Sequence, residues 1–401
     1  MSRWWSHSFK ANMSDRAIIR FVNVLGASSA AFEQFSLYRA EHQLGEGQYL
    51  VSWHRPANGK VVDYVEKDSE KALAREGFVP QKLRVYAADG SLLKHVRNVR
   101  ALLQRLREAK RKTVVHLHSP TGGALFQVLK VLGLVSAPTV YTVHNVFPRF
   151  TLRNKILTIF NCLMADEVAF CGLASERSHP AWLRGILGKK ARSVQNGANF
   201  ERVMEVSRRM ESEPKQSSGR FELVNVARMI EVKQQSSLLK LLAALPQHFH
   251  LTIVGGGELD GALRQEAVSL GLSERVTFTG IVPRDVAIEK MGRADLFVSP
   301  STFEGLPIAV LEAMAMARPV LLSNIGPHQE LCEFGCDPRQ LISGWDLDVW
   351  KERVMALAQM SSEELACLGA SNRDCIAGTF TLQKMHAGYT RLYDALFQQA
   401  E

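Results

Sequence analysis

The feature that most constrains the fold is an alternation of short β-rich runs with helical patterns, which occurs in both halves of the chain. In the first half the β-rich runs lie at residues 17–24, 113–118, 138–143 and 165–170. In the second half they lie at residues 221–226, 249–254, 276–278, 296–298 and 320–323. Such alternation predicts an α/β fold, in which parallel sheets carry helices on both faces.

The length of 401 residues exceeds what one ordinary core accommodates, so we expect two domains. The polar stretch 207–220 contains Pro, Ser and Gly and is the best linker candidate. We therefore predict a first domain at 14–206 and a second at 221–380. Residues 381–401 carry apolar side chains at helical spacing and form a separate final helix in this prediction.

The composition indicates a soluble globular protein, with 46% hydrophobic and 22% charged residues. No apolar run approaches the ~20 residues of a membrane span, and the first ten residues lack the apolar core of a signal peptide. Met13 is an alternative start to Met1. The six cysteines are scattered among apolar neighbours, which favours reduced thiols and a cytoplasmic protein.

The net charge of +9 fits three kinds of partner: nucleic acid, an anionic membrane face or phosphorylated small molecules. Zinc-finger spacing and RNP-like aromatic motifs are both absent from the sequence, which argues against nucleic acid.

Two carboxylates, Glu304 and Glu312, flank a Gly-Leu-Pro turn and the start of an apolar helix. Pro307 suits the first helical position, so Glu304 is expected just before the helix and Glu312 inside it. A helix N-terminus has unpaired N–H groups and partial positive charge, which suit a phosphate. Carboxylates beside it can accept hydrogen bonds from sugar hydroxyls. The alternative interpretation is an ordinary helix with an acidic first turn.

Other polar groups follow the neighbouring β-rich runs of the second half. Open parallel sheets bind ligands at the carboxyl ends of their strands, which is where these groups are expected to lie. Arg228 and Lys233 come after the run ending at residue 226, and two cations suit a diphosphate. Glycines 255–257 follow the next run and allow close approach of a phosphate, although they do not match G-x-G-x-x-G. The backbone near Val282 could contact a nucleobase. Solvated cations and ordinary turn glycines are the alternatives for each feature taken alone.

The first half offers histidines at two run ends. His144 and Asn145 follow the run 138–143, and His144 could donate to a sugar hydroxyl or handle a proton. His116 and His118 alternate on one strand; we expect His116 to be buried and His118 to face the acceptor side. Two histidines without a visible third ligand do not predict a metal site.

These motifs resemble those of the family-four retaining glycosyltransferases of the GT-B fold. The resemblance is specific at 222–331 and looser before 190, and it includes Asn196-Gly197 at the end of the first domain. It implies two Rossmann-like domains that face across a cleft, with the C-terminal helix crossing back to the first. It also implies a hexosyltransferase-type, retaining, metal-independent enzyme that uses a UDP- or GDP-sugar as substrate, with no cofactor.

The resemblance also assigns roles to particular residues. Arg228 and Lys233 would hold the pyrophosphate and stabilise the departing diphosphate. Glu304 would contact the donor sugar, and Glu312 the ribose hydroxyls. Further donor contacts are implied for the following positions: Gly26, Gly256, Val282, Gly305, Leu306 and His144.

The sequence departs from the family at three places. The N-terminal loop has one glycine, Gly26, where the family has paired glycines. Arg318 stands where the family has glycine, and we expect it on the surface. The segment 326–330 replaces the usual Gly-Gly-x-x-Glu, which leaves the role of Glu330 open.

Two segments bear on the acceptor, which the family implies to be a lipid-linked or growing glycan in cell-surface polysaccharide synthesis. Residues 92–112 form a basic amphipathic helix, and residues 147–160 mix basic and large apolar side chains. Either could dock peripherally on an anionic inner membrane face, or pack as an ordinary helix with a solvated basic face. We favour ordinary packing for 92–112, and both interpretations remain for 147–160.

Two other functions remain. A nucleotide-sugar epimerase of GT-B-like fold would act without an acceptor. A non-catalytic partner of another transferase would bind a nucleotide-sugar without catalysing its conversion.

Overall fold

The computed structural model describes residues 16–24, 48–54, 84–87, 92–110, 112–212 and 219–399. Its described residues divide into two compact units. The first takes residues up to Cys171, Glu176–Val194 and those from His386 onward, and the second takes Gly172–Ser175 and Gln195–Met385. Gly26 and the residues around it lie outside the described part of the chain.

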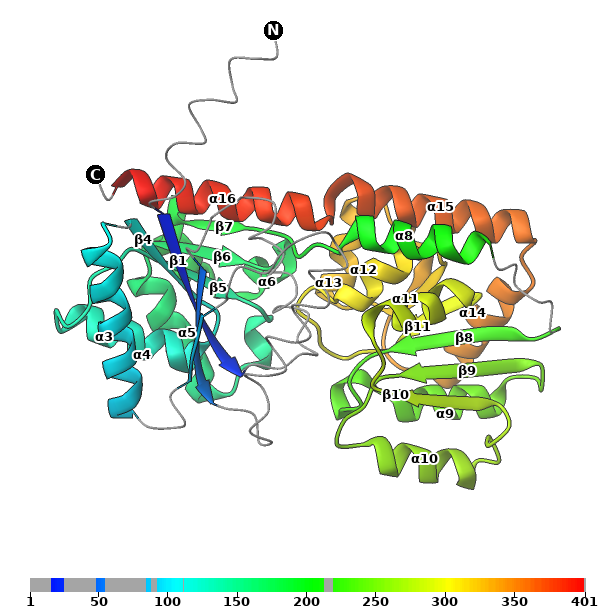
Figure 1. Cartoon of the computed structure of the whole chain (residues 1–401). Helices are drawn as coiled ribbons and strands as arrows, with labels where there is room; N and C mark the ends of the chain where they lie inside the picture. Colours follow the sequence, from blue (N-terminus) through cyan, green and yellow to red (C-terminus); the bar gives the residue numbers. More distant parts are fainter. Residues whose placement is uncertain are drawn as a thin grey trace, which may run out of the picture. The chain divides into compact units, whose positions relative to one another are not determined.

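The first unit contains a parallel sheet in the order β3-β2-β1-β4-β5-β6-β7 (Figure 1). Its strands are β1 Arg16–Val24, β2 Gln48–His54, β3 Arg84–Ala87, β4 Lys112–Leu117, β5 Thr139–Val143, β6 Glu167–Phe170 and β7 Ala191–Ser193. Its helices are α3 Leu92–Glu108, α4 Pro120–Val131, α5 Leu152–Met164, α7 Ala181–Leu187 and most of α16 Leu382–Gln399. The short helix α6 Leu173–Ser178 contains the boundary between the units.

The second unit contains a parallel sheet in the order β10-β9-β8-β11-β12-β13. Its strands are β8 Phe221–Val226, β9 Phe249–Val254, β10 Val276–Gly280, β11 Leu296–Ser299, β12 Val320–Ser323 and β13 Leu341–Ile342. Its helices are α8 Phe200–Glu211, α9 Gln235–Ala244, α10 Asp260–Ser269, α11 Arg284–Arg293, α12 Ile308–Ala315, α13 Gly326–Glu333, α14 Leu347–Ala358 and α15 Ser362–Thr379. The chain runs outward from β8 to β10, then returns to the other side of β8 with β11. The strand order therefore reverses between β8 and β11, which is where open α/β sheets bind ligands.

The predicted α/β class with two parallel sheets is confirmed. Every predicted run is a strand of the structure, because β-branched and aromatic residues dominate these runs. Strands β5, β6, β11 and β12 are buried along their whole length, as expected for central strands of a sheet that is covered on both faces. The final helix is also present, and its residues from His386 onward group with the first unit.

The domain boundary differs from the prediction. The chain enters the second unit at Gln195, and residues 207–211, which we assigned to the linker 207–220, are the last turns of α8. This helix is polar on its outer face, but it buries Val203 and Val206 against the second unit. Arg202 Nε lies 2.6 Å from Asp285 Oδ1 of α11. The polar composition that suggested a linker is that of a solvated helix face.

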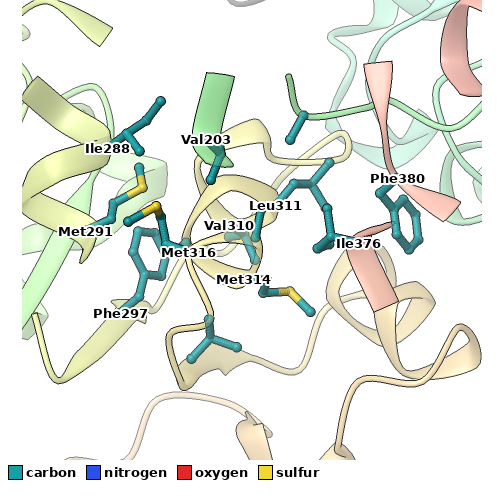
Figure 2. Packing of buried hydrophobic residues seen from close by; sticks show 14 of the residues in the cluster. Val203, Ile288, Met291, Phe297, Val310, Leu311, Met314, Met316, Ile376 and Phe380 are labelled. Atoms are coloured by element: carbon teal, nitrogen blue, oxygen red, sulfur yellow. The ribbon is translucent and has the colours of Figure 1, made fainter. Parts of the chain in front are cut away.

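Helix α12 is held by the main hydrophobic core of the second unit. Figure 2 shows Val310, Leu311 and Met314 of this helix among side chains from several other elements. Those labelled around them are Val203, Ile288, Met291, Phe297, Met316, Ile376 and Phe380. Because dense packing fixes a helix in place, the polar residues before and within α12 have defined positions.

The amphipathic helix α3 packs as an ordinary helix, since Val99, Leu102 and Leu106 are buried in the core of the first unit. Among the described residues, no helix is both long and apolar enough to cross a membrane.

Candidate functional site

The strongest candidate site lies at the reversal point of the second sheet, where the loops after β8 and β11 meet. Lys233 ends the short 3-10 helix Glu231–Lys233 after β8, and its Nζ lies 2.5 Å from Glu304 Oε1 in the loop after β11. The Lys233 side chain is 18% exposed and that of Glu304 is 9% exposed. The amide of Thr302 donates to the carbonyl of Val232 at 2.9 Å, so the backbone also joins the two loops. A cation and a carboxylate therefore meet at the edge where the sheet topology predicts a ligand.

Arg228 lies on the same edge and is exposed. The Gln235 side chain donates to the Arg228 carbonyl at 3.0 Å, which fixes the backbone of this loop. The structure thus brings Arg228, Lys233 and Glu304 to one strand edge, as the sequence predicts, with Lys233 and Glu304 in direct contact.

The glycines after β9 pack against the loop that carries Arg228. Gly255 has φ +133°, and a Cβ there would collide with the Ala227 carbonyl oxygen. A Cβ on Gly257 would likewise collide with the Met229 carbonyl oxygen, whereas Gly256 faces only the Ile281 side chain. Gly255 and Gly257 are therefore required for close backbone packing, and Gly256 is the member of the run with more open surroundings.

The turn before α12 is placed as predicted, with one small difference. The helix begins at Ile308, and Pro307 is its N-cap rather than its first residue. Glu304 lies before the helix and Glu312 inside it. Leu306 is buried, and its carbonyl accepts a hydrogen bond from the Asn196 side chain at 3.1 Å. The helix N-terminus that suits a phosphate therefore stands directly after Glu304 and Gly305.

Glu312 has a partner that the sequence did not reveal. Arg284, the first residue of α11, donates from Nε to Glu312 Oε1 at 2.7 Å, and its Nη2 lies 2.5 Å from Oε2. The Glu312 side chain is only 4% exposed, so its charge is balanced by a two-pronged contact. Val282 lies two residues before Arg284 and packs partly against the main core of the unit. No sequence signal marked Arg284, because an arginine that begins a helix after a proline is unremarkable.

His328 of α13 is a second residue that the sequence did not single out as functional. It is fully buried and its Nδ1 lies 2.7 Å from the Ser323 carbonyl oxygen. Burial lowers its pKa, and the nearby charge of Glu304 acts in the opposite direction. His328 therefore lies within electrostatic reach of the Lys233–Glu304 pair as a neutral side chain.

Glu330, whose role was open, is a structural residue within the second unit. Its two oxygens accept hydrogen bonds from the amides of Leu173 and Ala174, both at 2.9 Å. Arg318, which we expected on the surface, is only partly exposed, and its guanidinium donates to the carbonyls of Met316 and Ala294 at 3.2 Å.

The predicted histidines of the first unit come together. His118 follows β4 and His144 follows β5, and His118 Nδ1 lies 2.9 Å from His144 Nε2. Only part of the His144 ring reaches solvent, and burial lowers its pKa to about 4. His144 is therefore neutral near pH 7, and one imidazole of the pair donates while the other accepts. Asn145 is exposed beside them.

His116 is buried, as predicted, and anchors the end of the chain. Its Nδ1 lies 2.6 Å from the Tyr393 hydroxyl of α16, and its Nε2 lies 2.7 Å from Thr142 Oγ1. Its ring lies against that of His118, with centroids 3.8 Å apart. Helix α16 therefore supports the strand that positions the His118–His144 pair.

Within the described part of the chain, no group of three or more His, Cys, Asp or Glu side chains could hold a metal ion. All six cysteines are free thiols.

Comparison with known proteins identifies the second unit. Residues 220–359 match the family described as glycosyl transferases group 1. The chain carries a glycosyl transferase group 1 domain. The match spans β8 to α14 and includes every second-unit candidate residue named above.

Two relatives and one solved structure extend this comparison. EpsF of Bacillus subtilis (strain 168) is 28% identical over 232 residues, which are 54% of this chain and 59% of that protein. The Escherichia coli UDP-Gal:alpha-D-GlcNAc-diphosphoundecaprenol alpha-1,3-galactosyltransferase is 23% identical over 385 residues, 90% of this chain and 91% of that protein. Anabaena HepE, solved in complex with UDP and glucose, superimposes with a TM-score of 0.74 at 17% identity, covering 95% of this chain and 100% of that chain. The fold is thus that of GT-B glycosyltransferases.

Proposed function

We propose that this protein is a retaining glycosyltransferase that moves a sugar from a UDP- or GDP-sugar to an acceptor hydroxyl. The observation that carries the proposal is the contact between Lys233 and Glu304 at the reversal point of the second sheet, directly before the N-terminus of α12. Cations and a helix N-terminus suit a diphosphate, and a neighbouring carboxylate suits sugar hydroxyls. A nucleotide-sugar contains both groups.

In the proposed reaction, Arg228 and Lys233 stabilise the negative charge that develops on the departing diphosphate. When Lys233 turns toward the diphosphate, Glu304 is released to accept hydrogen bonds from the donor sugar. Glu312, held by Arg284, is the acceptor for the ribose hydroxyls. These cations take the place of a metal ion, so we propose that the reaction needs no metal and no cofactor.

The acceptor in this proposal is a lipid-linked or growing glycan. It is supported by the relative of Escherichia coli, whose name gives a diphosphoundecaprenol-linked sugar as the substrate. His118, His144 and Asn145 of the first unit are the proposed polar groups on the acceptor side, with neutral His144 able to donate to a sugar hydroxyl.

Donor binding is the first test. Thermal-shift titrations with UDP-, GDP- and ADP-sugars should show stabilisation by one nucleotide class, and Arg228→Ala should weaken it. Turnover is then followed as release of the nucleoside diphosphate in the presence of a lipid-linked acceptor. We expect Lys233→Ala to lower kcat about a hundredfold or more, while Lys240→Ala, an exposed lysine of α9, leaves it unchanged.

Three outcomes separate the alternatives. Binding without turnover under any acceptor would favour the non-catalytic partner. Conversion of the donor sugar without an acceptor would favour an epimerase. Loss of turnover in EDTA, restored by a divalent cation, would contradict metal independence.

A further inference from the structure

Helix α5 has apolar side chains on both faces: Cys162 and Ile159 pack in the core of the first unit, and other apolar residues face outward. Its buried residues include Thr158 and Asn161, whereas Leu152 and Ile156 are 75% and 60% exposed. Leu163, 40% exposed, continues the same outward face at helical spacing. The Asn161 side chain donates to the Pro120 carbonyl at 2.8 Å, while its buried Oδ1 has no hydrogen-bond partner among the described residues. The outward face of α5 therefore leaves an apolar stripe exposed to solvent.

Helix α7, which packs against α5, has apolar residues on both sides. Leu183 and Leu187 are buried in the core, while Trp182 and Ile186 are 53% and 65% exposed. A helix that is apolar all round is normally covered on all sides. We call Leu152, Ile156, Leu163, Trp182 and Ile186, with Arg149, Arg153 and Lys155, the α5–α7 surface.

The exposed end of α4 adds to this apolar area. Helix α4 packs against α5, and the two are drawn together in Figure 1. Val131 and Leu132 at its end are 63% and 65% exposed. Ten of the sixteen large apolar side chains that are exposed among the described residues lie on α4, α5, α7 or directly after α4. Clustering of this kind marks an interaction surface rather than scattered exposed residues.

Basic side chains outnumber acidic ones in the sequence around this surface. Between Lys112 and Ala165 the sequence contains no Asp or Glu, whereas Arg149 and Arg153 are exposed at the start of α5. The nearest carboxylate in sequence, that of Asp166, is paired with Lys130 at 2.6 Å. Lys189, which follows α7, is exposed as well. A partner that is apolar inside and negatively charged at its boundary complements these groups.

We propose that the α5–α7 surface docks the first unit on an anionic lipid bilayer. Leucine, isoleucine and tryptophan side chains enter the interface between headgroups and acyl chains, and the arginines contact lipid phosphates. Trp182 is well suited to this depth, because tryptophan concentrates at membrane–water interfaces. This inference goes beyond the proposed transfer reaction and is tested without donor or acceptor, so either proposal can fail alone.

The test is sedimentation of the full chain with vesicles of phosphatidylcholine, with and without phosphatidylglycerol. We expect binding to the anionic vesicles only, with loss of binding at high salt. Two variants probe the surface. The apolar variant combines Leu152→Ser, Ile156→Ser and Trp182→Ser. The charge variant combines Arg149→Gln and Arg153→Gln. The charge variant should partition onto the anionic vesicles about tenfold or more weakly than the unchanged chain. Each basic residue near an anionic surface raises the partition coefficient roughly fivefold.

Matched controls lie elsewhere in the chain. Val268→Ser with Val349→Ser removes exposed apolar side chains of the second unit, and Arg100→Gln with Arg107→Gln removes exposed charges of α3. Both should bind vesicles within about twofold of the unchanged chain. Equal binding to neutral vesicles, full binding by the α5–α7 variants, or an equal loss in the α3 variant would overturn the proposal. Conversion of a dimer to a monomer by the apolar variant, with no vesicle binding by the unchanged chain, would instead identify a subunit interface.

A second readout does not depend on the folding of the multiple variants. The emission of Trp182 is obtained as the difference between the unchanged chain and Trp182→Phe. It should shift to the blue with anionic vesicles and be quenched by brominated acyl chains. An emission spectrum of Trp182 that does not change with vesicles would refute docking through α7.

Discussion

At the scale of single residues, the partly buried His144 of the first unit gives the protein a defined response to acid. Burial lowers the pKa of His144 to about 4, below the ~6.5 of an exposed imidazole. Between these two values the unfolded chain binds more protons at this position than the folded chain. Stability is therefore fully present above about pH 6.5 and is lost as the pH falls toward 4.

The unchanged chain should lose unfolding free energy between about pH 7 and pH 5, and we predict that His144→Asn loses less, by on the order of 1 kcal/mol. This difference is smaller than full burial would give, because part of the His144 ring reaches solvent. Urea denaturation at the two pH values measures it. His248→Asn, at an exposed histidine, is the control. The buried His328 has a lowered pKa in both proteins, so some acid sensitivity remains in the variant. An undiminished loss in His144→Asn would mean that this imidazole is not held neutral.

At the scale of elements, the loop after β9 supports the loop after β8 through close backbone contact. The amide of Ala227 donates to the Val254 carbonyl at 3.0 Å, and the amide of Met229 donates to the Gly256 carbonyl at 3.0 Å. Arg228 stands between these two bonds. Its position on the strand edge therefore depends on glycines that never need to touch a ligand.

Two glycines of this region allow a matched comparison. Gly255→Ala should destabilise the protein by about 2–4 kcal/mol, because φ is +133° and the new Cβ meets the Ala227 carbonyl oxygen. Gly261→Ala, on exposed α10 with nothing within 4 Å of a Cβ, should stabilise it by a few tenths to about 1 kcal/mol. Chemical denaturation compares the two. Similar stabilities would show that the loop after β9 relaxes around a side chain.

At the scale of the whole molecule, the sequence predicted what depends on local pattern and missed what depends on tertiary pairing. The buried strands were recognisable because β-branched runs end at turn residues. The contact between Arg284 and Glu312 was not, since it joins two helix starts that are far apart in the chain. The outward apolar stripe of α5 was also not predictable, because a helix with apolar residues on both faces gives no periodicity that marks one face as exposed.

Candidate residues divide in the same way. Lys233, Glu304, His118 and His144 were found from their places at strand ends, and the sheets bring each pair into contact. Residues 207–211 of the predicted linker are helical, because a solvated helix face and a linker have similar composition, and residues 213–218 lie outside the described part of the chain. Gly26 lies outside the described residues, so its assigned role remains a prediction.

The path of the chain leads to a last prediction about how the two units depend on each other. The final helix follows the second unit in sequence, yet from His386 onward it belongs to the first. Its Tyr389, Leu392, Tyr393 and Leu396 are almost fully buried. Besides the His116 contact, the Arg16 guanidinium lies 2.7 Å from the Asp394 carboxylate.

Removal of residues 386–401 should therefore unfold the first unit and leave the second unit folded. Most of the first unit lies far before these residues in the sequence. The reason is that β4 and β5 lose buried contacts with two tyrosines, and each such aromatic deletion costs about 3–5 kcal/mol in a core. Hydrogen exchange read strand by strand measures the effect: β4 and β5 should lose protection while β8 and β11 keep theirs. Removal of residues 400–401 alone is the control. Retained protection of β4 in the shortened chain would show that the first unit is stable without its last helix, and loss at β8 would show that the units fold as one.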